Sequence, residues 1–140
     1  MKILVTGANG YLGQGIVSSI LDRNCEVVAA DISCAHVDAR AESVECNLFE
    51  VVNPFDYFGK PDVLLHLAWR DGFVHNSDAH LSDLPKHYSF IRSIIEGGIS
   101  RVAVMGSMHE VGFYEGSIDE NTPCHPMSMY GIGKNALREA

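Results

Sequence analysis

Tyr130 and Lys134 stand four residues apart in the segment YGIGK near the end of the chain. Residues at positions i and i+4 share one face of a helix, so a helix here would bring the phenol and the ammonium group together. An ammonium group close to a phenol favours the phenolate, which can take a proton from an alcohol and return it. Taken alone, the pair is more typical of an exposed helix face without function.

Ser107 lies just beyond the apolar run RVAVM of residues 101–105. In a parallel sheet, residues beyond the carboxyl ends of the strands line the ligand crevice. A serine hydroxyl there could hydrogen-bond the carbonyl or hydroxyl of a substrate. The alternative is an ordinary turn or capping serine.

Three glycines, Gly7, Gly10 and Gly13, follow the apolar run of residues 3–5 in the segment TGANGYLG. Such a triplet permits a tight turn, a close approach of the backbone to a bound group, and close packing of a helix on a strand. The N-terminus of the following helix offers free N–H groups to a pyrophosphate. An ordinary turn is the alternative, but the strand before and the helix after favour dinucleotide binding.

Asp31 ends the second apolar run, EVVAAD. An acidic side chain there can accept hydrogen bonds from the hydroxyls of the adenosine ribose. It would also repel a 2′-phosphate, so NAD is favoured over NADP. A strand-ending turn residue is the alternative.

These residues are positioned by alternating strands and helices. Predicted strands cover residues 2–6, 26–31, 43–46, 62–68 and 101–105. Predicted helices cover residues 12–22 and 81–97 and begin again at Ser128, whereas residues 49–59 and 106–125 are predicted loops, the first with one helical turn. The alternation and the nearly continuous apolar strands predict an α/β fold with a doubly wound parallel sheet and right-handed crossovers.

The composition narrows the class of protein. The 140 residues are 46% hydrophobic and carry a net charge of −8, which is typical of a soluble globular protein and argues against nucleic acid. No apolar run reaches membrane-spanning length, and the short run at residues 1–5 does not fit a signal peptide. None of the four cysteines forms a C-x-x-C pair, so we expect reduced, structural cysteines in a cytoplasmic protein.

Together these segments resemble the extended short-chain dehydrogenase/reductase family of nucleotide-sugar epimerases, dehydratases and reductases. TGANGYLG is similar to its T-G-x-x-G-x-x-G loop, DVLLHLA to its D-h-h-h-H-x-A segment (h, apolar), and SMHEVG lies where its serine segment belongs. DENTPCHPMSMYGIGK resembles its D/E-x-x-P-x-x-P-x-S-x-Y-x-x-S/A-K block. The resemblance implies a Rossmann-type sheet of strand order 3-2-1-4-5, and one NAD-binding domain over residues 1–140.

The resemblance also implies a cofactor site for NAD. The pyrophosphate would lie against Gly7, Gly10 and Gly13 and the backbone of Tyr11 and Leu12.

Further along the dinucleotide, Asp31 would bind the adenosine ribose. Asn47 and Leu48 occupy the place of the Asp-Leu or Asp-Val pair that the family sets against the adenine. Leu67 and Ala68 would line the rest of the path.

For catalysis, the resemblance implies that Tyr130 is the acid/base and that Ser107 orients the reacting oxygen. Lys134 would favour the Tyr130 phenolate and hold the nicotinamide ribose. Hydride would pass between a sugar carbon and the nicotinamide.

Two departures from the family pattern stand out. The segment SDLPKHYSFIRS lacks the asparagine of the family's Asn-Val-x-Gly-Thr helix, with Asp83, His87 or Ser89 as candidate replacements. Of the Thr-Asp-Glu of sugar dehydratases, only Glu110 is kept. The second departure favours an epimerase or a 4-ketoreductase over a dehydratase.

The resemblance implies two more strands and a smaller substrate domain beyond Ala140. We therefore expect a fragment that keeps the cofactor site and is inactive alone. The expected partner is a small-molecule substrate, a nucleotide sugar, with neither nucleic acid nor a membrane, and a homodimer of the full-length protein stays open. Two alternatives remain: a reductase acting on a non-sugar ketone, and a non-catalytic NAD-binding module.

Several other polar or aromatic residues have a possible role. The spacing of His75 and His80 matches no helical pair, so no metal site is expected. His109 and Glu110, just after Ser107, either face the substrate or lie in a solvated loop, and the loop is favoured. Trp69 either covers the nicotinamide pocket or packs, and Arg70 either meets a substrate phosphate or is simply exposed.

Overall fold

The computed structural model describes all 140 residues, which gather into two compact units. We call residues 1–68 with 89–105 the sheet unit, and residues 69–88 with 106–140 the helical unit. The boundary falls inside one helix, after Tyr88. None of the helices is both long and apolar enough to cross a membrane.

The sheet unit contains five parallel strands in the order β3-β2-β1-β4-β5, which confirms the predicted α/β class and strand order. Leu4 in the central strand lies opposite Val28 on one side and Leu64 on the other. The strands are β1 (Lys2–Thr6), β2 (Glu26–Asp31), β3 (Glu42–Glu45), β4 (Val63–His66) and β5 (Arg101–Val104).

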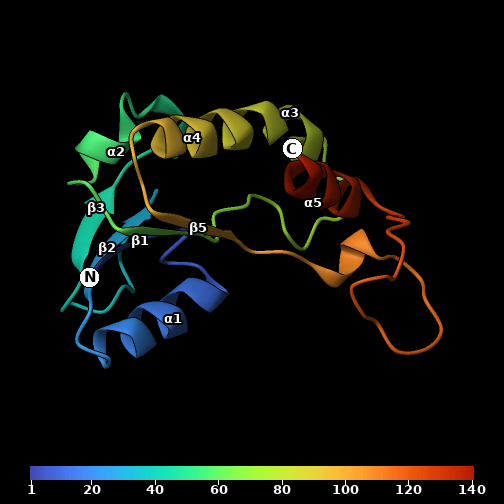
Figure 1. The fold of residues 1–140 in the computed structure, drawn as a ribbon, viewed down its shortest axis with the longest axis horizontal. Coiled ribbons are helices and arrows are strands. Elements are labelled where there is room, and N and C mark those ends of the chain that lie inside the picture. The colour runs from blue at the N-terminus through green and yellow to red at the C-terminus, as the bar shows by residue number, and fades with distance from the viewer. The chain divides into compact units, whose positions relative to one another are not determined.

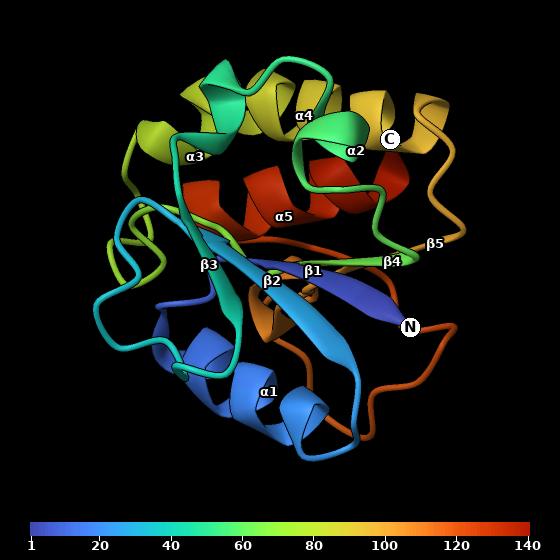
Figure 2. The same ribbon diagram turned by 90° about the vertical axis from the view of Figure 1, so that its left-hand side faces the viewer.

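Helices cover both faces of this sheet, because side chains alternate between the faces along each strand. Helix α1 (Tyr11–Leu21) lies on one face, where Val17 packs against residues such as Val5 and Val27 (Figures 1 and 2). Helix α2 (Pro54–Tyr57) and the part of helix α4 (Leu84–Glu96) beyond residue 88 lie on the other.

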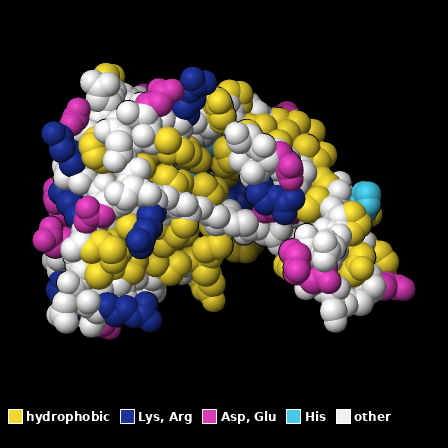
Figure 3. Space-filling view, viewed as in Figure 1, with side chains coloured by type: hydrophobic (Ala, Val, Ile, Leu, Met, Phe, Trp, Pro, Cys, Tyr) yellow, Lys and Arg dark blue, Asp and Glu magenta, His cyan; other side chains and the backbone are white.

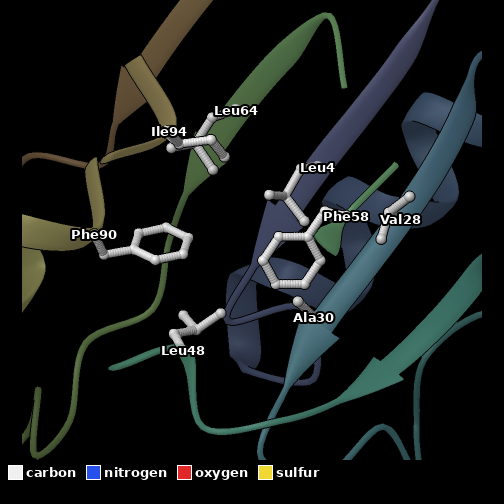
Figure 4. Packing of buried hydrophobic residues seen from close by; sticks show 8 residues of the cluster. All are labelled: Leu4, Val28, Ala30, Leu48, Phe58, Leu64, Phe90 and Ile94. Carbon is white, nitrogen blue, oxygen red and sulfur yellow. The ribbon is translucent and has the colours of Figure 1, made fainter. Parts of the chain in front are cut away.

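The larger of the two cores lies on the α4 face. Figure 4 shows side chains from strands, loops and helices converging there. The eight buried members are Leu4, Val28, Ala30, Leu48, Phe58, Leu64, Phe90 and Ile94. Phe58 and Phe90 meet edge to face with ring centroids 6.5 Å apart, a favourable aromatic geometry.

Strand β5 is one of the two edge strands of the sheet, the other being β3, and both are largely exposed. Ala103 and Val104 are exposed, and hydrophobic side chains reach the surface in this part of the sheet unit (Figure 3). The strand has a paired neighbour only on its β4 side.

The predicted helix over residues 81–97 differs from the structure, which has α3 (Ala79–Ser82) and then α4, with Asp83 between them. Pro85 explains the break. It has no N–H to donate and its ring excludes the carbonyl four residues earlier, so it is tolerated only in the first turn of a helix.

The predicted loops contain short helices. A 3₁₀ turn, η1 (Leu48–Glu50), and α2 lie near or within residues 49–59, and a second turn, η2 (Met108–Glu110), lies in the predicted loop from residue 106.

In the helical unit, α5 (Met129–Glu139) packs against η2 and α3. Ser128 begins α5 as predicted, since its side chain accepts the N–H of Gly131. Gly131 and Gly133 allow this packing, because a Cβ at Gly133 would lie 2.8 Å from the His80 carbonyl oxygen, and one at Gly131 would overlap that of His109.

Candidate functional site

The glycine loop joins β1 to α1 in the sheet unit. Gly7 has a φ of +70°, and a Cβ there would lie 2.6 Å from the backbone nitrogen of Ala68. A Cβ on Gly13 would overlap the carbonyl oxygen of Gly7 and approach that of Ala8 to 2.6 Å. Two of the three glycines are therefore required by close backbone packing around the turn.

Helix α1 begins without a side-chain cap. Gly10 is the N-cap residue and has no side chain to offer, and no acidic residue lies in the first turn. The N–H groups of Tyr11, Leu12 and Gly13 have no acceptor within the helix, because the first turn never does. This end of the helix is suited to an anion such as a pyrophosphate.

Asp31 is bound to the glycine loop. Its Oδ2 accepts the N–H of Asn9 at 2.9 Å, and its Oδ1 accepts the N–H of Ile32 at 2.7 Å. Asn9 in turn accepts the N–H of His36 at 2.8 Å. The sequence reasoning missed Asn9, although its place between two glycines of the loop was a usable signal.

The two residues expected against the adenine differ in what they can offer. Asn47 caps η1, accepting the N–H of Phe49 at 3.2 Å and donating to Glu50 at 2.8 Å. The side chain of Leu48 is buried in the core, so only its backbone is available to a ligand.

Leu67 and Ala68 come directly after β4, and the Ala68 backbone lies against Gly7. The structure thus brings all ten predicted cofactor residues of the sheet unit to the carboxyl ends of β1, β2, β3 and β4 and to the start of α1.

The three predicted catalytic residues lie in the helical unit. Ser107 begins η2: its Oγ accepts the N–H of His109 at 3.2 Å, and its own N–H donates to Glu110 Oε1 at 2.6 Å. Because the Oγ acts as an acceptor here, the hydroxyl proton stays available to a substrate oxygen.

The ring of Tyr130 is surrounded by aromatic side chains. Four ring centroids lie close to the centroid of the Tyr130 ring: His80 at 5.2 Å, His109 at 5.3 Å, His75 at 5.9 Å and Trp69 at 6.2 Å. The backbone N–H of Tyr130 donates to the His75 carbonyl oxygen at 2.9 Å. Residues from three separate segments therefore fix the start of α5 and the phenol that it carries.

Lys134 lies one turn beyond Tyr130 and is buried. Burial lowers the pKa of Lys134 to about 8, and the nearby Glu110 carboxylate opposes that change. The Nζ lies 4.4 Å from the centre of the Trp69 ring, within cation–π range.

Of the three candidates for the missing asparagine, His87 is the one associated with Lys134. It is buried and stacks on Trp69 at 4.5 Å, and burial together with the Lys134 charge lowers the pKa of His87 to about 4. Ser89 is exposed.

The third candidate, Asp83, is committed to other partners. It pairs with Arg70 at 2.7 Å and with Lys86 at 2.8 Å. Arg70 binds this carboxylate at the start of α4, and its side chain is 62% exposed.

A pocket of about 440 Å³ opens beside Tyr130 in the helical unit. Two of its residues, His75 and His109, contact the Tyr130 ring. Polar and apolar residues both line the pocket: His75, Asn76, Met108, His109, Gly112, Phe113, Met127 and Ser128. The sequence favoured a solvated loop for His109, with a place facing the substrate as the alternative, and the structure has it lining this pocket.

Comparison with known proteins extends these observations. A family model described as the NAD-dependent epimerase/dehydratase family matches residues 3–140. The chain is 42% identical over 145 aligned residues to a dTDP-6-deoxy-L-talose 4-dehydrogenase (NAD⁺) from Aggregatibacter actinomycetemcomitans. That alignment covers all of this chain and 54% of the relative, so the chain spans about half the length of the protein it matches.

Solved structures show the same fold. A UDP-glucose 4-epimerase from Thermotoga maritima, crystallised with UDP-glucose, matches with a TM-score of 0.85 and 19% identity, over 99% of this chain and 49% of its own. A UDP-glucuronic acid 4-epimerase from Bacillus cereus, in complex with NAD, matches with a TM-score of 0.79 and 19% identity, over 99% and 50%.

Proposed function

The chain belongs to the NAD-dependent epimerase/dehydratase family, and we propose that it is the cofactor-binding and catalytic part of an enzyme that oxidises or reduces a nucleotide sugar at C4. The observation that carries the proposal is the grouping of Ser107, Tyr130 and Lys134 within the helical unit, since α5 carries two of them and packs against the turn that Ser107 caps.

The glycine loop fits NAD. The positive φ of Gly7, the close packing around Gly13 and the uncapped start of α1 leave backbone N–H groups for a pyrophosphate. Asp31 would accept hydrogen bonds from the adenosine ribose. When bound, NAD accepts a hydride from the sugar carbon or returns it.

The residues of the helical unit supply the proton chemistry. In the oxidising direction, Tyr130 Oη takes the proton of the sugar C4 hydroxyl, and in the reducing direction it returns that proton to the carbonyl oxygen. The charge of Lys134 favours the phenolate. The Ser107 hydroxyl donates a hydrogen bond to the same sugar oxygen.

The relative from Aggregatibacter supports a 4-dehydrogenase, or 4-ketoreductase in the reverse direction, acting on a dTDP-6-deoxyhexose. The pocket beside Tyr130 suits such a ring, because its polar residues can bind hydroxyls and its apolar residues, such as Met108 and Phe113, can cover a C6 methyl. A 4-epimerase uses the same residues and is the second candidate, supported by the two fold relatives named for that reaction.

The test uses the protein that carries this chain, NAD⁺ and a dTDP-6-deoxyhexose, with NADH absorbance and sugar products as readouts. Formation of NADH indicates a dehydrogenase, and interconversion of C4 isomers without NADH indicates an epimerase. Tyr130→Phe should lower kcat at least about 100-fold. Tyr114→Phe, a matched change at an exposed tyrosine, should leave it unchanged.

Two results would contradict the proposal. Saturable NAD binding without turnover of any nucleotide sugar would indicate a non-catalytic binding module or an enzyme that acts on a non-sugar ketone. Full activity in Tyr130→Phe would remove the proposed acid/base.

A further inference from the structure

We propose that Trp69 is a positioning residue that holds the Tyr130 ring and the Lys134 ammonium group in their working arrangement, and that His80 fixes the indole in turn. The reaction that this arrangement serves rests on the proposed function. The contacts themselves do not depend on it.

The indole lies along the face of α5 that carries both candidate catalytic groups. Lys134 Nζ is 4.4 Å from the ring centre, and the Tyr130 ring meets the indole edge to face, with centroids 6.2 Å apart and planes at 72°. Between them, a Cβ on Gly133 would come within 3.3 Å of the indole. Positions 130, 133 and 134 share one helix face, so the indole contacts this face over a full turn.

The indole also stabilises the charge of Lys134, whose side chain is buried. Lys134 is 5% exposed, and burial of an ammonium group without a partner is costly. The negative face of an indole attracts a cation, with more effect where water is excluded. Trp69 therefore favours one place for the Lys134 charge, close to the start of α5.

Hydrogen bonds fix the orientation of the indole. Trp69 Nε1 donates to His80 Nδ1 at 2.9 Å. An indole N–H can only donate, so Nδ1 carries no proton and the neutral imidazole carries it on Nε2. That Nε2–H donates to the Val74 carbonyl oxygen at 2.9 Å, so both ring nitrogens of His80 are engaged.

These two bonds leave His80 one orientation and one tautomer. His80 is 1% exposed, so water cannot replace either partner. With both nitrogens engaged, His80 is a tether for Trp69 and has no nitrogen left for a metal ion.

A third aromatic ring completes the arrangement. His87 stacks on Trp69 with centroids 4.5 Å apart and planes at 11°. Burial and the Lys134 charge keep the pKa of His87 at about 4, so this ring is neutral at physiological pH and adds no charge beside the ammonium group. Charged or titratable side chains around this cluster come from η2, α3, α4, α5 and the segments before α3 and α4: His75, His109, Glu110, His80, Asp83, Lys86, His87, Tyr130 and Arg138.

Trp69 is the only tryptophan of the chain, so its fluorescence reports this contact directly. Emission of the unaltered chain is followed across a pH titration. We expect a transition with a midpoint near pH 8, where Lys134 loses its proton. Lys134→Met should abolish this fluorescence transition. Two controls should keep the transition: Tyr130→Phe, and Lys60→Met, which removes a surface lysine paired with Asp56.

Two results would contradict the proposed contact between the indole and the ammonium group. One is the absence of the transition in the unaltered chain, and the other is its persistence in Lys134→Met. Loss of the transition in Tyr130→Phe would assign it to the phenol and also overturn the proposal. None of these outcomes requires turnover, so the proposed function can fail while this inference stands.

A kinetic measurement separates positioning from simple packing. Trp69→Phe keeps a ring face for Lys134 but loses the N–H to His80, whereas Trp69→Leu loses both. In the enzyme, we expect kcat to fall about 10-fold in the first and about 100-fold in the second, with KM for the sugar unchanged. The pH profile of kcat should move in Trp69→Leu only.

Circular dichroism and NAD binding confirm that each variant is folded. Equal kcat values for the two variants and the wild type, or a loss confined to KM, would contradict a positioning role.

Discussion

Glu110 accepts the backbone N–H of Ser107 through Oε1 at 2.6 Å, while Ser107 Oγ accepts the N–H of His109 at 3.2 Å. This reciprocal capping of η2 follows from the spacing S-x-x-E. The Glu110 carboxylate is 4% exposed, lies 3.7 Å from Arg138, and acts on the charge of Lys134. One buried carboxylate thus orients the candidate hydroxyl and favours the ammonium form of the candidate lysine.

Glu110→Gln should separate these two effects. The amide oxygen can still accept the Ser107 N–H, but the negative charge that supports the Lys134 ammonium group is gone. The pKa of Lys134 should therefore fall below about 8. NMR titration of ¹³Cε-labelled lysine measures it.

Glu139→Gln is the matched control for that variant. Glu139 also pairs with Arg138, at 2.8 Å, but its side chain is 65% exposed. The Lys134 pKa should stay unchanged in this control. An unchanged or higher value in Glu110→Gln would contradict the electrostatic role of Glu110.

Stability should depend on pH through Lys134. Its folded-state pKa of about 8 lies below the ordinary 10.5, so the unfolded chain binds more protons between these values and stability rises with pH in that window. Below pH 8, burial of the charge costs up to about 3 kcal/mol. Urea unfolding of the wild type and of Lys134→Met, which does not titrate, isolates this contribution.

The free energy of unfolding of the wild type relative to Lys134→Met should therefore increase by about 3 kcal/mol from neutral pH to pH 10.5. A difference that is constant across this range would show that Lys134 titrates normally in the folded chain.

Asp31 should determine the preference between NADH and NADPH. Asp31→Asn keeps an oxygen for the Asn9 N–H but removes the charge that repels a 2′-phosphate. We expect the ratio of the two Kd values to shift toward NADPH by about 10-fold, or about 1.4 kcal/mol. Nicotinamide fluorescence gives both constants.

Asp62→Asn serves as the control, because Asp62 binds the Lys2 N–H at 2.7 Å, near the amino ends of β1 and β4. The NADH to NADPH ratio should not change there. An equal shift in both variants would assign the effect to overall charge.

Two alanine substitutions in α1 should have opposite effects. A Cβ on Gly13 would overlap the Gly7 carbonyl oxygen, so Gly13→Ala should lower the free energy of unfolding by about 2 kcal/mol and abolish NAD binding. A Cβ on Gly15 meets nothing within 4 Å, so Gly15→Ala should raise it by about 0.5–1 kcal/mol.

Urea unfolding and NADH titration of the two variants provide the comparison. Gly13→Ala with normal NADH affinity would show that α1 can move away from the loop without harm, against the packing described for the glycine triplet.

The fold was predictable where local signals were strong. The apolar runs around Leu4, Val28 and Leu64 became strands β1, β2 and β4, and the glycine loop became the turn into α1. The order of the strands came from the resemblance to a family, because apolar periodicity indicates a parallel sheet without saying which strands are neighbours. The predicted helix over residues 81–97 was wrong at Asp83, because Pro85 is tolerated only in the first turn of a helix and so separates α3 from α4.

The sequence by itself determined the residue types and the short-range spacings of this protein: the glycine triplet, Asp31 at the end of its strand, and Tyr130 and Lys134 on one face of a helix. Each of these depends on conformations that residues within a few positions impose on one another.

Only the tertiary structure decided what surrounds those groups. Trp69, His80 and Glu110 reach the Tyr130–Lys134 face from segments distant in the sequence. The side chain of Leu48 lies in the core, which leaves its backbone for the predicted cofactor contact. The physical reason is that burial, ring stacking and the pKa of a buried lysine depend on which side chains from distant segments lie around each group. The packing of the whole unit determines which side chains those are.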